Sequence, residues 1–259
     1  MLLKRIIFLI AFISLFSAAR SQKKTLHIMA YNIHHGCDIH ETLQLNNIAA
    51  LIKKSGAEII GLEEVDSVCT RSGKTDQAKI LGELTGMNYY FVRHFPYQGG
   101  AYGLALLSKY PVSTITNNRI PISATENGIS STAVLTAGIK INNKDSIKVL
   151  VAHLDYRSNA SRIHQSKVIF NFINASKQPV ILLGDMNATP KSETIQNLTH
   201  FFADANKQNY LTFPSDSAKT KIDYILIDKE HFVKTLAAPR FDSVQYSDHL
   251  PVLADVEIK

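Results

Sequence analysis

The chain has 259 residues, of which 45% are hydrophobic and 19% are charged, and its formal net charge is +6. This composition excludes a disordered or fibrous protein, and the length suits one large domain or two small ones. The 28 basic residues less Lys4, Arg5 and Arg20 leave 25 against 22 acidic residues, a net charge of +3 from Ser21 onward. That excess is too small to indicate a strongly basic nucleic-acid-binding surface.

The first 21 residues have the pattern of a secretory signal peptide. Lys4 and Arg5 precede the apolar residues 6–16, and the small residues 17–19 follow. This order predicts cleavage near residues 19–22. The apolar segment of about 11 to 14 residues is shorter than a membrane-spanning helix requires, although an uncleaved anchor stays open as an alternative. We therefore expect an exported protein, periplasmic or extracellular.

The remaining sequence alternates between strand and helix patterns. The first half predicts strands at residues 26–32, 57–62, 89–94 and 103–108, helices at 45–52 and 76–84, and a mobile loop rich in Gly and Tyr at 97–103. The second half predicts strands at residues 112–115, 131–141, 146–152, 180–184, 221–227 and 252–258, a helix at 161–175 and a short helix from Ser192. No Pro- or Ser-rich linker divides the chain, so we predict a single domain over residues 22–259.

The strand at residues 180–184 is apolar enough to be buried on both faces, and Asp185 and Asn187 follow it directly. The carboxyl end of such a strand is where an open α/β sheet places its ligands. Asn32 and Glu64 are 32 positions apart, as are His153 and Asp185. Each span reads strand, loop, helix, strand, which indicates two βαβ-like units related by approximate internal symmetry. Coincidental spacing is the alternative.

Polar side chains with oxygen and imidazole donors follow several of these strands. They are Asn32, Glu64, His153, Asp185, Asn187, Asp223, Asp248 and His249. Such a set, without a thiolate, suits Mg²⁺ or Mn²⁺ better than structural zinc. Mg²⁺ usually takes one or two carboxylates from the protein, which matches Glu64 helped by Asn32 and Asp248.

The motifs, in order, resemble those of the endonuclease/exonuclease/phosphatase superfamily, which includes pancreatic deoxyribonuclease, abasic-site endonucleases, neutral sphingomyelinases and inositol polyphosphate 5-phosphatases. They are Tyr31-Asn32-Ile33, Leu62-Glu63-Glu64-Val65, GLALLSKYP at residues 103–111, His153-Leu154-Asp155, Gly184-Asp185-Met186-Asn187, Ile222-Asp223-Tyr224 and Ser247-Asp248-His249. The resemblance extends from about residue 26 to the C-terminus. It implies an α/β fold, a four-layer sandwich of two mixed β-sheets packed face to face with helices outside.

The resemblance also implies roles for the matching residues. Glu64 would be the principal metal ligand, with Asn32 nearby and Asp248 assisting. Asp185 would orient or deprotonate the attacking water, and Asn187 would hold that water or a phosphate oxygen. His249, oriented by Asp223, would donate to a non-bridging phosphate oxygen. His153 would stabilise the phosphate or protonate the leaving oxygen.

The sequence departs from the family pattern at two positions. Glu63 stands where the family commonly has Gln, and we expect it to cap backbone groups on the other side of the strand. Glu126 is not followed by the Arg found in many bacterial relatives, which leaves a phosphate contact from that position in doubt. Aromatic residues at 95, 97 and 102 are expected either to stack on a base or sugar or to cover the core. Pairing of Cys37 with Cys69 is left open.

These observations favour an exported phosphoesterase that uses Mg²⁺, or Mn²⁺, to hydrolyse a phosphodiester by attack of water. Its substrate is a phosphate ester, and nucleic acid, a lipid head group and a small phosphodiester all remain open. The alternatives are a sphingomyelinase-like lipid phosphodiesterase, a phosphomonoesterase and a non-catalytic binding module that keeps the fold. We infer no obligatory protein partner and expect a monomer.

Overall fold

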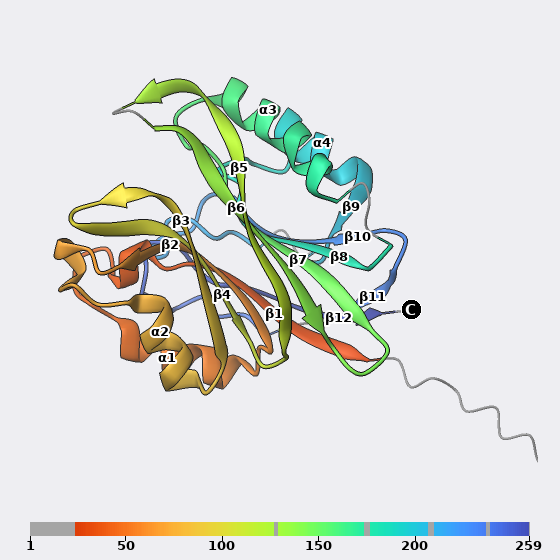
Figure 1. The fold of residues 1–259 in the computed structure, drawn as a ribbon, viewed down its shortest axis with the longest axis horizontal. Coiled ribbons are helices and arrows are strands. Elements are labelled where there is room, and N and C mark those ends of the chain that lie inside the picture. Colours follow the sequence, from red (N-terminus) through yellow and green to blue (C-terminus); the bar gives the residue numbers. More distant parts are fainter. Residues whose placement is uncertain (1–23, 127–128, 174–176, 207–209, 237–238, 259) are drawn as a thin grey trace, which may run out of the picture.

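The computed structural model describes residues 24–126, 129–173, 177–206, 210–236 and 239–258. The predicted signal peptide, residues 1–21, lies outside the described residues. Two six-stranded sheets pack face to face, and helices cover their outer faces (Figure 1). Both sheets contain parallel and antiparallel pairs. The predicted four-layer α/β sandwich is therefore confirmed.

The first sheet contains β1 (Thr25–Asn32), β2 (Ile59–Ser67), β3 (Asn88–Tyr97), β4 (Gly100–Ser108), β11 (Phe232–Leu236) and β12 (Val252–Ile258). Their spatial order is β11-β12-β1-β2-β4-β3. Leu26 and Ile28 of β1 lie in the core between the sheets, whereas Met29 and Tyr31 pack in the core under the helices. The strand is thus buried on both faces, as expected for the middle of a sheet covered on each side.

The second sheet contains β5 (Val112–Glu126), β6 (Ile129–Lys140), β7 (Ser146–His153), β8 (Val180–Asp185), β9 (Phe202–Asp204) and β10 (Asp223–Asp228). Their spatial order is β5-β6-β7-β8-β10-β9. Ile181 and Leu183 of β8 face the other sheet, and Val180 and Leu182 face the outer helices. The apolar segment before Asp185 is therefore a strand buried on both faces.

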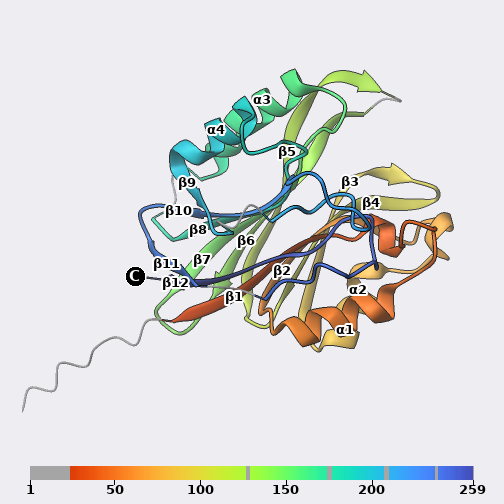
Figure 2. The same cartoon turned by 180° about the vertical axis from the view of Figure 1, so that it is seen from behind.

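The helices form the two outer layers (Figure 2). They are α1 (Leu45–Ser55) and α2 (Gln77–Thr85) on the first sheet, and α3 (Asn159–Ile169) and α4 (Glu193–Phe201) on the second, with short 3-10 helices η1 (His34–Gly36), η2 (Thr70–Ser72) and η3 (Phe170–Phe172). The side chains of Asp76, Ser158 and Ser192 accept backbone N–H groups at the starts of α2, α3 and α4. Within the part of the chain that the structure describes, no helix has the length and apolar character needed to cross a membrane.

The two sheets repeat the same local topology. β1 pairs in parallel with β2 and places Asn32 beside Glu63, and β7 pairs in parallel with β8 and places His153 beside Asp185. In each sheet, the parallel pair lies between two neighbouring strands that both run antiparallel to it. The predicted pair of βαβ-like units is present, and their last residues meet at one edge of the sandwich.

Residues 97–103 were expected to form a mobile loop, and this expectation is wrong. β3 and β4 continue to within two residues of each other and form a hairpin. Gln98 and Gly99 make its turn, with φ angles of 43° and 80°, the left-handed conformation that tight hairpin turns require. Gly100 allows β4 to approach β2, because a methyl group on it would lie 2.2 Å from the carbonyl oxygen of Ser67. Gly99 therefore serves the turn, and Gly100 serves close packing.

We expect Gly100→Ala to destabilise the protein by about 1–3 kcal/mol, because the added methyl group meets backbone that cannot rotate away. Urea unfolding would measure the change. Gly99→Ala is the matched control, since the nearest atom to its added methyl group is 3.9 Å away and only its φ of +80° is unfavourable. An equal loss of stability in both variants would contradict the steric explanation.

Cys37 and Cys69 are both buried free thiols. The Cys69 Sγ donates to the carbonyl oxygens of Tyr97 and Ala101, at 3.2 and 3.3 Å. The pairing that the sequence left open is therefore not formed in this structure. The Cys69 thiol instead joins the end of β2 to the β3–β4 hairpin.

Candidate active site

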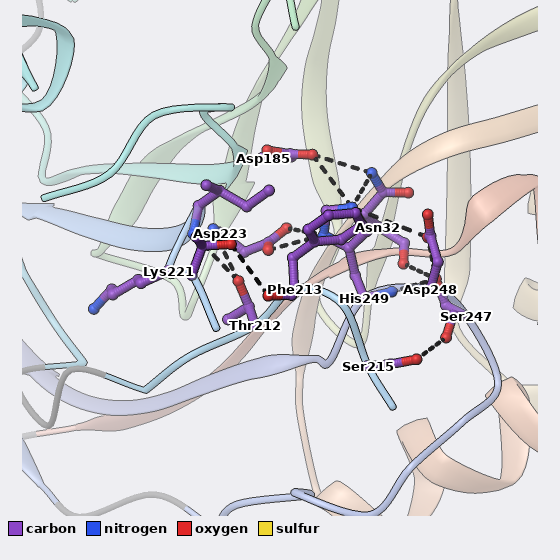
Figure 3. Close-up of polar contacts among 12 residues, drawn as sticks. Asn32, Asp185, Thr212, Phe213, Ser215, Lys221, Asp223, Ser247, Asp248 and His249 are labelled. Atoms are coloured by element: carbon purple, nitrogen blue, oxygen red, sulfur yellow. Dashed lines mark hydrogen bonds and ion pairs between the residues drawn. The ribbon is translucent and has the colours of Figure 1, made fainter. Parts of the chain in front are cut away.

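The polar residues singled out in the sequence meet where strands of both sheets end. Asn32, His153 and Asp185 are the last residues of β1, β7 and β8, and Asp223 is the first residue of β10. His249 lies just before β12. Figure 3 shows that the side chains of Asn32, Asp185, Asp223 and His249 point toward one another.

The centre of the group is a chain of two carboxylates and one imidazole (Figure 3). The His249 Nδ1 lies 2.9 Å from Oδ2 and 3.2 Å from Oδ1 of Asp223, and its Nε2 lies 3.7 Å from Oδ2 of Asp185. All three residues are buried. Burial opposes protonation of His249, but the nearby charge of Asp223 outweighs it and raises the pKa of His249 to about 10. The imidazole is therefore cationic at neutral pH, with Nε2 directed to Asp185.

Asp185 is the residue on which most of these contacts converge. Its Oδ2 lies 3.2 Å from the Asn32 Nδ2 and 3.6 Å from the His153 Nε2, and its Oδ1 accepts the backbone N–H of Asn187 at 2.8 Å. Burial and the charge of Asp223 raise the pKa of Asp185 to about 6, against the opposing effect of His249 and His153. A carboxyl group with this pKa exchanges a proton close to neutral pH, which suits a general base.

Asn32 links Asp185 to Glu64. Its side-chain amide donates to Oε1 of Glu64 at 3.1 Å as well as to Asp185, and its Oδ1 accepts the backbone N–H of His34 at 3.1 Å. The Asn32 backbone carbonyl accepts the hydroxyl of Ser247 at 2.7 Å. The last turn before β12 is thereby fixed to the end of β1.

Glu64 occupies a bulge in β2. The register with β4 shifts between Leu62 and Val65, and Glu64 has a φ of 57°. A left-handed conformation costs a non-glycine residue of the order of 1–3 kcal/mol and persists where the surrounding structure demands it, often at functional sites. Burial opposes ionisation of Glu64, but His153 and the Asn32 hydrogen bond lower its pKa below the ordinary value. The carboxylate is held ionised at the edge of the site.

Asn187 and Asp248 are placed differently from the central group. The Asn187 side chain donates to the carbonyl oxygen of Leu154 at 3.0 Å, and its backbone supports Asp185. Asp248 is partly exposed, accepts the hydroxyl of Ser247 at 3.3 Å, and has its Oδ1 4.0 Å from Nε2 of His249. Among the described residues, no hydrogen bond or ion pair joins Asp248 directly to Glu64 or Asn32.

Glu63 does not cap backbone groups, contrary to the expectation from the sequence. Its side chain is fully buried, and neither carboxyl oxygen has a hydrogen-bond partner among the described residues. It lies against Gly184, where a methyl group would be 2.9 Å from Oε1 of Glu63. Burial, together with the charges of Asp223 and Asp185, raises the pKa of Glu63 well above its usual range. The buried Glu63 side chain next to the site is therefore a neutral carboxylic acid.

This group of side chains fits a divalent cation. Glu63, Glu64, Asp185 and Asp223 bring four carboxyl groups together, and burial, with mutual repulsion added to it, raises the pKa of Glu63 and of Asp185. Asp185, Asp223 and His249 also offer ligand atoms within 4.8 Å of one another. Because His249 is already protonated and bonded to Asp223, that trio is better suited to moving a proton. The ionised oxygen donor at Glu64 is the better cation ligand.

A second group with possible metal ligands lies beside the site, at His34, His35 and Glu41. The His35 Nε2 lies 2.8 Å from Oε2 of Glu41, and the two histidine rings have centroids 4.3 Å apart. His34 is partly exposed, but His35 is buried.

Some residues around the site were not singled out in the sequence. A cavity of about 260 Å³ adjoins Glu64 and His153, and Arg71 and His94 help to line it. The Arg71 guanidinium forms two hydrogen bonds with Asp66, at 2.8 and 2.9 Å. Because both arginine and histidine are common in loops and strands, their position at the cavity depends on tertiary packing that the sequence pattern does not reveal.

Comparison with known proteins supports the same fold and family. YbhP of Escherichia coli K12, described as an uncharacterized protein, is 23% identical over 256 residues, covering 92% of this chain and 99% of YbhP. The endonuclease/exonuclease/phosphatase from Bacteroides vulgatus superposes with a TM-score of 0.74 at 18% identity, covering 92% of this chain and 100% of that one. The Bacteroides thetaiotaomicron mannosyl-6-phosphatase superposes with a TM-score of 0.71 at 15% identity, covering 90% and 99%. Residues 29–249 match the model of the Endonuclease/Exonuclease/phosphatase family, and the chain belongs to that family.

Proposed function

We propose that this protein hydrolyses phosphate esters by attack of water at the Asp185–His249 site, with a divalent cation bound at Glu64. Membership of the family supports a phosphoesterase hydrolase in general terms. The more specific proposal rests on an unbroken chain of direct contacts from one carboxylate to the next. In order, the chain runs through Asp223, His249, Asp185, Asn32 and Glu64.

The cation in this proposal is Mg²⁺ or Mn²⁺, held by Glu64 and Asn32 with Asp248 nearby. When bound, it would neutralise charge on the phosphate oxygens and lower the pKa of a bound water. Asn32 contributes by restraining the Glu64 carboxylate. Its amide oxygen accepts a backbone hydrogen bond in the present arrangement, so direct ligation would require the amide to turn over.

The side chains of the site supply the remaining steps. Asp185 accepts a proton from the attacking water, and Asn187 restrains Asp185 through its backbone N–H. The His249 Nε2 donates to a non-bridging phosphate oxygen, where its positive charge stabilises the developing negative charge. Asp223 keeps His249 protonated and oriented. His153 stabilises the phosphate or protonates the leaving oxygen.

A phosphodiester is the first substrate class in this proposal. A phosphomonoester is the second, because a structural neighbour of this chain is named a mannosyl-6-phosphatase. A sphingomyelinase-like activity on a lipid head group is a further alternative, and a non-catalytic binding module is the alternative of a different class. No obligatory protein partner is proposed, and we propose a monomer.

The proposal is tested by assaying the chain from Ser21 onward on bis-p-nitrophenyl phosphate and p-nitrophenyl phosphate. We expect release of nitrophenolate with Mg²⁺ or Mn²⁺, loss of activity in EDTA, and recovery when the cation is added back. The preferred substrate separates phosphodiesterase from phosphomonoesterase. Failure to hydrolyse either ester, or plasmid DNA and sphingomyelin, would favour the binding module.

The rate should depend on pH through two of the groups described. Asp185 must be deprotonated to act as a base, so kcat should rise with pH through the Asp185 pKa of about 6. His249 must be protonated, so kcat should fall as pH rises through the His249 pKa of about 10. The expected profile is a broad bell, measured as kcat at saturating substrate and cation. A rate that keeps falling from pH 6 to pH 9 would contradict these assignments.

We further propose that residues 1–21 direct export and are removed near residues 19–22, which places the mature protein in the periplasm or outside the cell. The charge, apolar segment and small residues of that stretch support the proposal. Mass spectrometry of the mature chain would test it. Recovery of the intact N-terminus would contradict cleavage.

A further inference from the structure

The cavity beside Glu64 and His153 is lined by four Phe and Tyr side chains among charged and polar residues. Phe95, Tyr97 and Tyr102 of the β3–β4 hairpin line one part of it, and Tyr156, just after β7, lines another. We call these four residues with the space they enclose the ring pocket. Its volume of about 260 Å³ is below the range typical of drug-sized ligands. The ring pocket is therefore suited to one ring system.

The wall formed by the β3–β4 hairpin is held in place before any ligand binds. The rings of Phe95 and Tyr102 are stacked, with centroids 5.2 Å apart and planes 29° apart. The Arg71 guanidinium lies 4.7 Å from the ring centroid of Tyr97 and 5.6 Å from that of Tyr102. Because Asp66 holds Arg71 in turn, the aromatic surface loses little freedom when a flat group lies against it.

Tyr156 provides an aromatic ring at the entrance. It is 72% exposed, and it follows His153 by only three residues. The Arg157 guanidinium lies 5.4 Å from its ring centroid. A large exposed aromatic side chain next to a phosphate site is typical of stacking on a base or sugar.

A basic cavity continues from the ring pocket. Its volume is about 800 Å³, and it adjoins the ring pocket, sharing His94, Phe95 and Tyr97 with it; we call the two adjoining cavities together the groove. Arg93, Arg119 and Arg157 line it, with Arg157 ion-paired to Asp155 at 3.1 Å, and we call it the arginine cavity. None of the lining residues that the structure describes there is acidic. The groove therefore runs from the phosphate site past aromatic rings to a cationic region.

Arg119 is held by backbone and serine oxygens, and among the described residues no carboxylate pairs with it. Its guanidinium donates to the carbonyl oxygens of Arg93 and His94, at 2.9 and 2.8 Å, and to the Ser131 side chain and carbonyl oxygen. These bonds join β3 to the β5–β6 hairpin. Burial and then the charge of Arg93 lower the pKa of Arg119, so an anion between the two arginines would relieve their repulsion.

We propose that this groove binds a small phosphate ester in which a ring separates the scissile phosphate from a second anionic group. The ring lies in the ring pocket, and the second anion lies near Arg93 and Arg119. The proposal rests on the proposed function for the position of the scissile phosphate. The low net charge from Ser21 onward and the single-ring size of the pocket favour a small molecule over duplex nucleic acid.

Isothermal titration calorimetry measures the affinity of each ligand without hydrolysis when the Asp185→Asn protein is used with Mg²⁺, and this tests the proposal. Adenosine 3′,5′-bisphosphate carries the ring and both anions, adenosine 5′-monophosphate lacks the second anion, and propane-1,3-diol bisphosphate lacks the ring. Glucose 1,6-bisphosphate keeps a sugar ring between its two phosphates and lacks the flat base that adenosine 3′,5′-bisphosphate carries on its ribose. We expect at least one ring-bearing bisphosphate to bind about tenfold or more tightly than either single-feature ligand.

Variants test which residues bind the second anion and which bind the ring. Arg93→Glu should weaken binding of the preferred bisphosphate by about tenfold and leave adenosine monophosphate nearly unchanged. Lys144→Glu, the same change of charge in the exposed turn after β6, is its control. Tyr156→Ala should weaken ring-bearing ligands and spare the propanediol compound, whereas Tyr156→Phe keeps the ring. Because Arg93 and Tyr156 are exposed, neither variant removes core packing.

Equal affinity for the ring-bearing and ring-free bisphosphates, or an unchanged affinity in Arg93→Glu, would overturn the proposal. Tighter binding of a single-stranded oligonucleotide than of either ring-bearing bisphosphate would overturn it in favour of a nucleic-acid groove. Selective binding by a protein that hydrolyses no phosphate ester would support the groove and refute the proposed function. Hydrolysis of bis-p-nitrophenyl phosphate without the expected binding order would refute the groove alone.

Discussion

Replacing Asp185 by asparagine is expected to lower kcat by about 10²–10⁴-fold, the range that a positioned general base contributes. The amide has nearly the same shape and still accepts the Asn187 backbone N–H, but it cannot take a proton from water. KM should change much less than kcat, because the substituted group acts mainly in the transition state. Steady-state hydrolysis of bis-p-nitrophenyl phosphate with saturating Mg²⁺ measures both constants.

The control for this prediction is Asp145→Asn, the same substitution in the exposed turn between β6 and β7. It should leave kcat near the wild-type value. Circular dichroism and urea unfolding would show that the Asp185→Asn protein is folded. A folded variant that keeps more than a tenth of the wild-type kcat would rule out Asp185 as the base.

Replacing Asp223 by asparagine should lower the activity at alkaline pH. Asp223 keeps the pKa of His249 at about 10, and its charge is the largest influence opposing burial. Without that charge, the pKa of His249 falls and the imidazolium is lost at lower pH. The alkaline limb of the kcat profile should therefore move down by roughly 1–3 pH units. The expected result combines a shifted pH profile with a lower maximal rate.

Asp255→Asn is a matched control for the Asp223 prediction. Asp255 also accepts from a histidine, at 2.8 Å from Nδ1 of His27, but this pair lies outside the site. The control should leave the pH profile unchanged. An alkaline limb that stays in place in a folded Asp223→Asn protein would mean that His249 is not the group whose protonation limits the rate.

The fold was predictable because the information lies in local patterns and in the order of the motifs. The alternation in β1 and the apolar run of β8 identify strands, and Asp185 follows β8 directly. Two parallel βαβ-like units bring the ends of their strands to one edge. For this reason Asn32, Glu64 and Asp185 could be expected together from the sequence, whereas Asp223 and His249 were grouped with them by their places beside other strands and by the resemblance of their motifs to the superfamily.

The features that were missed depend on contacts between distant segments. The hairpin at residues 97–103 resembles a loop in composition, and its glycines are explained only by the tight turn and by close packing on β2 and β3. The environment of Glu63 follows from the bulge at Glu64, because one extra residue in the strand changes which side chain faces the site. The short strands β9 and β11 are too brief to give a periodic signal.

The central claim is that Glu64, Asp185 and His249 act on one phosphate beside one cation. Crystals grown with Mn²⁺ and inorganic phosphate test it most directly, because manganese is located by its anomalous scattering. We predict a manganese ion bound by the Glu64 carboxylate and a phosphate that accepts a hydrogen bond from Nε2 of His249. Manganese bound instead at His34, His35 and Glu41, with no ion at Glu64 and no phosphate at His249, would contradict the account.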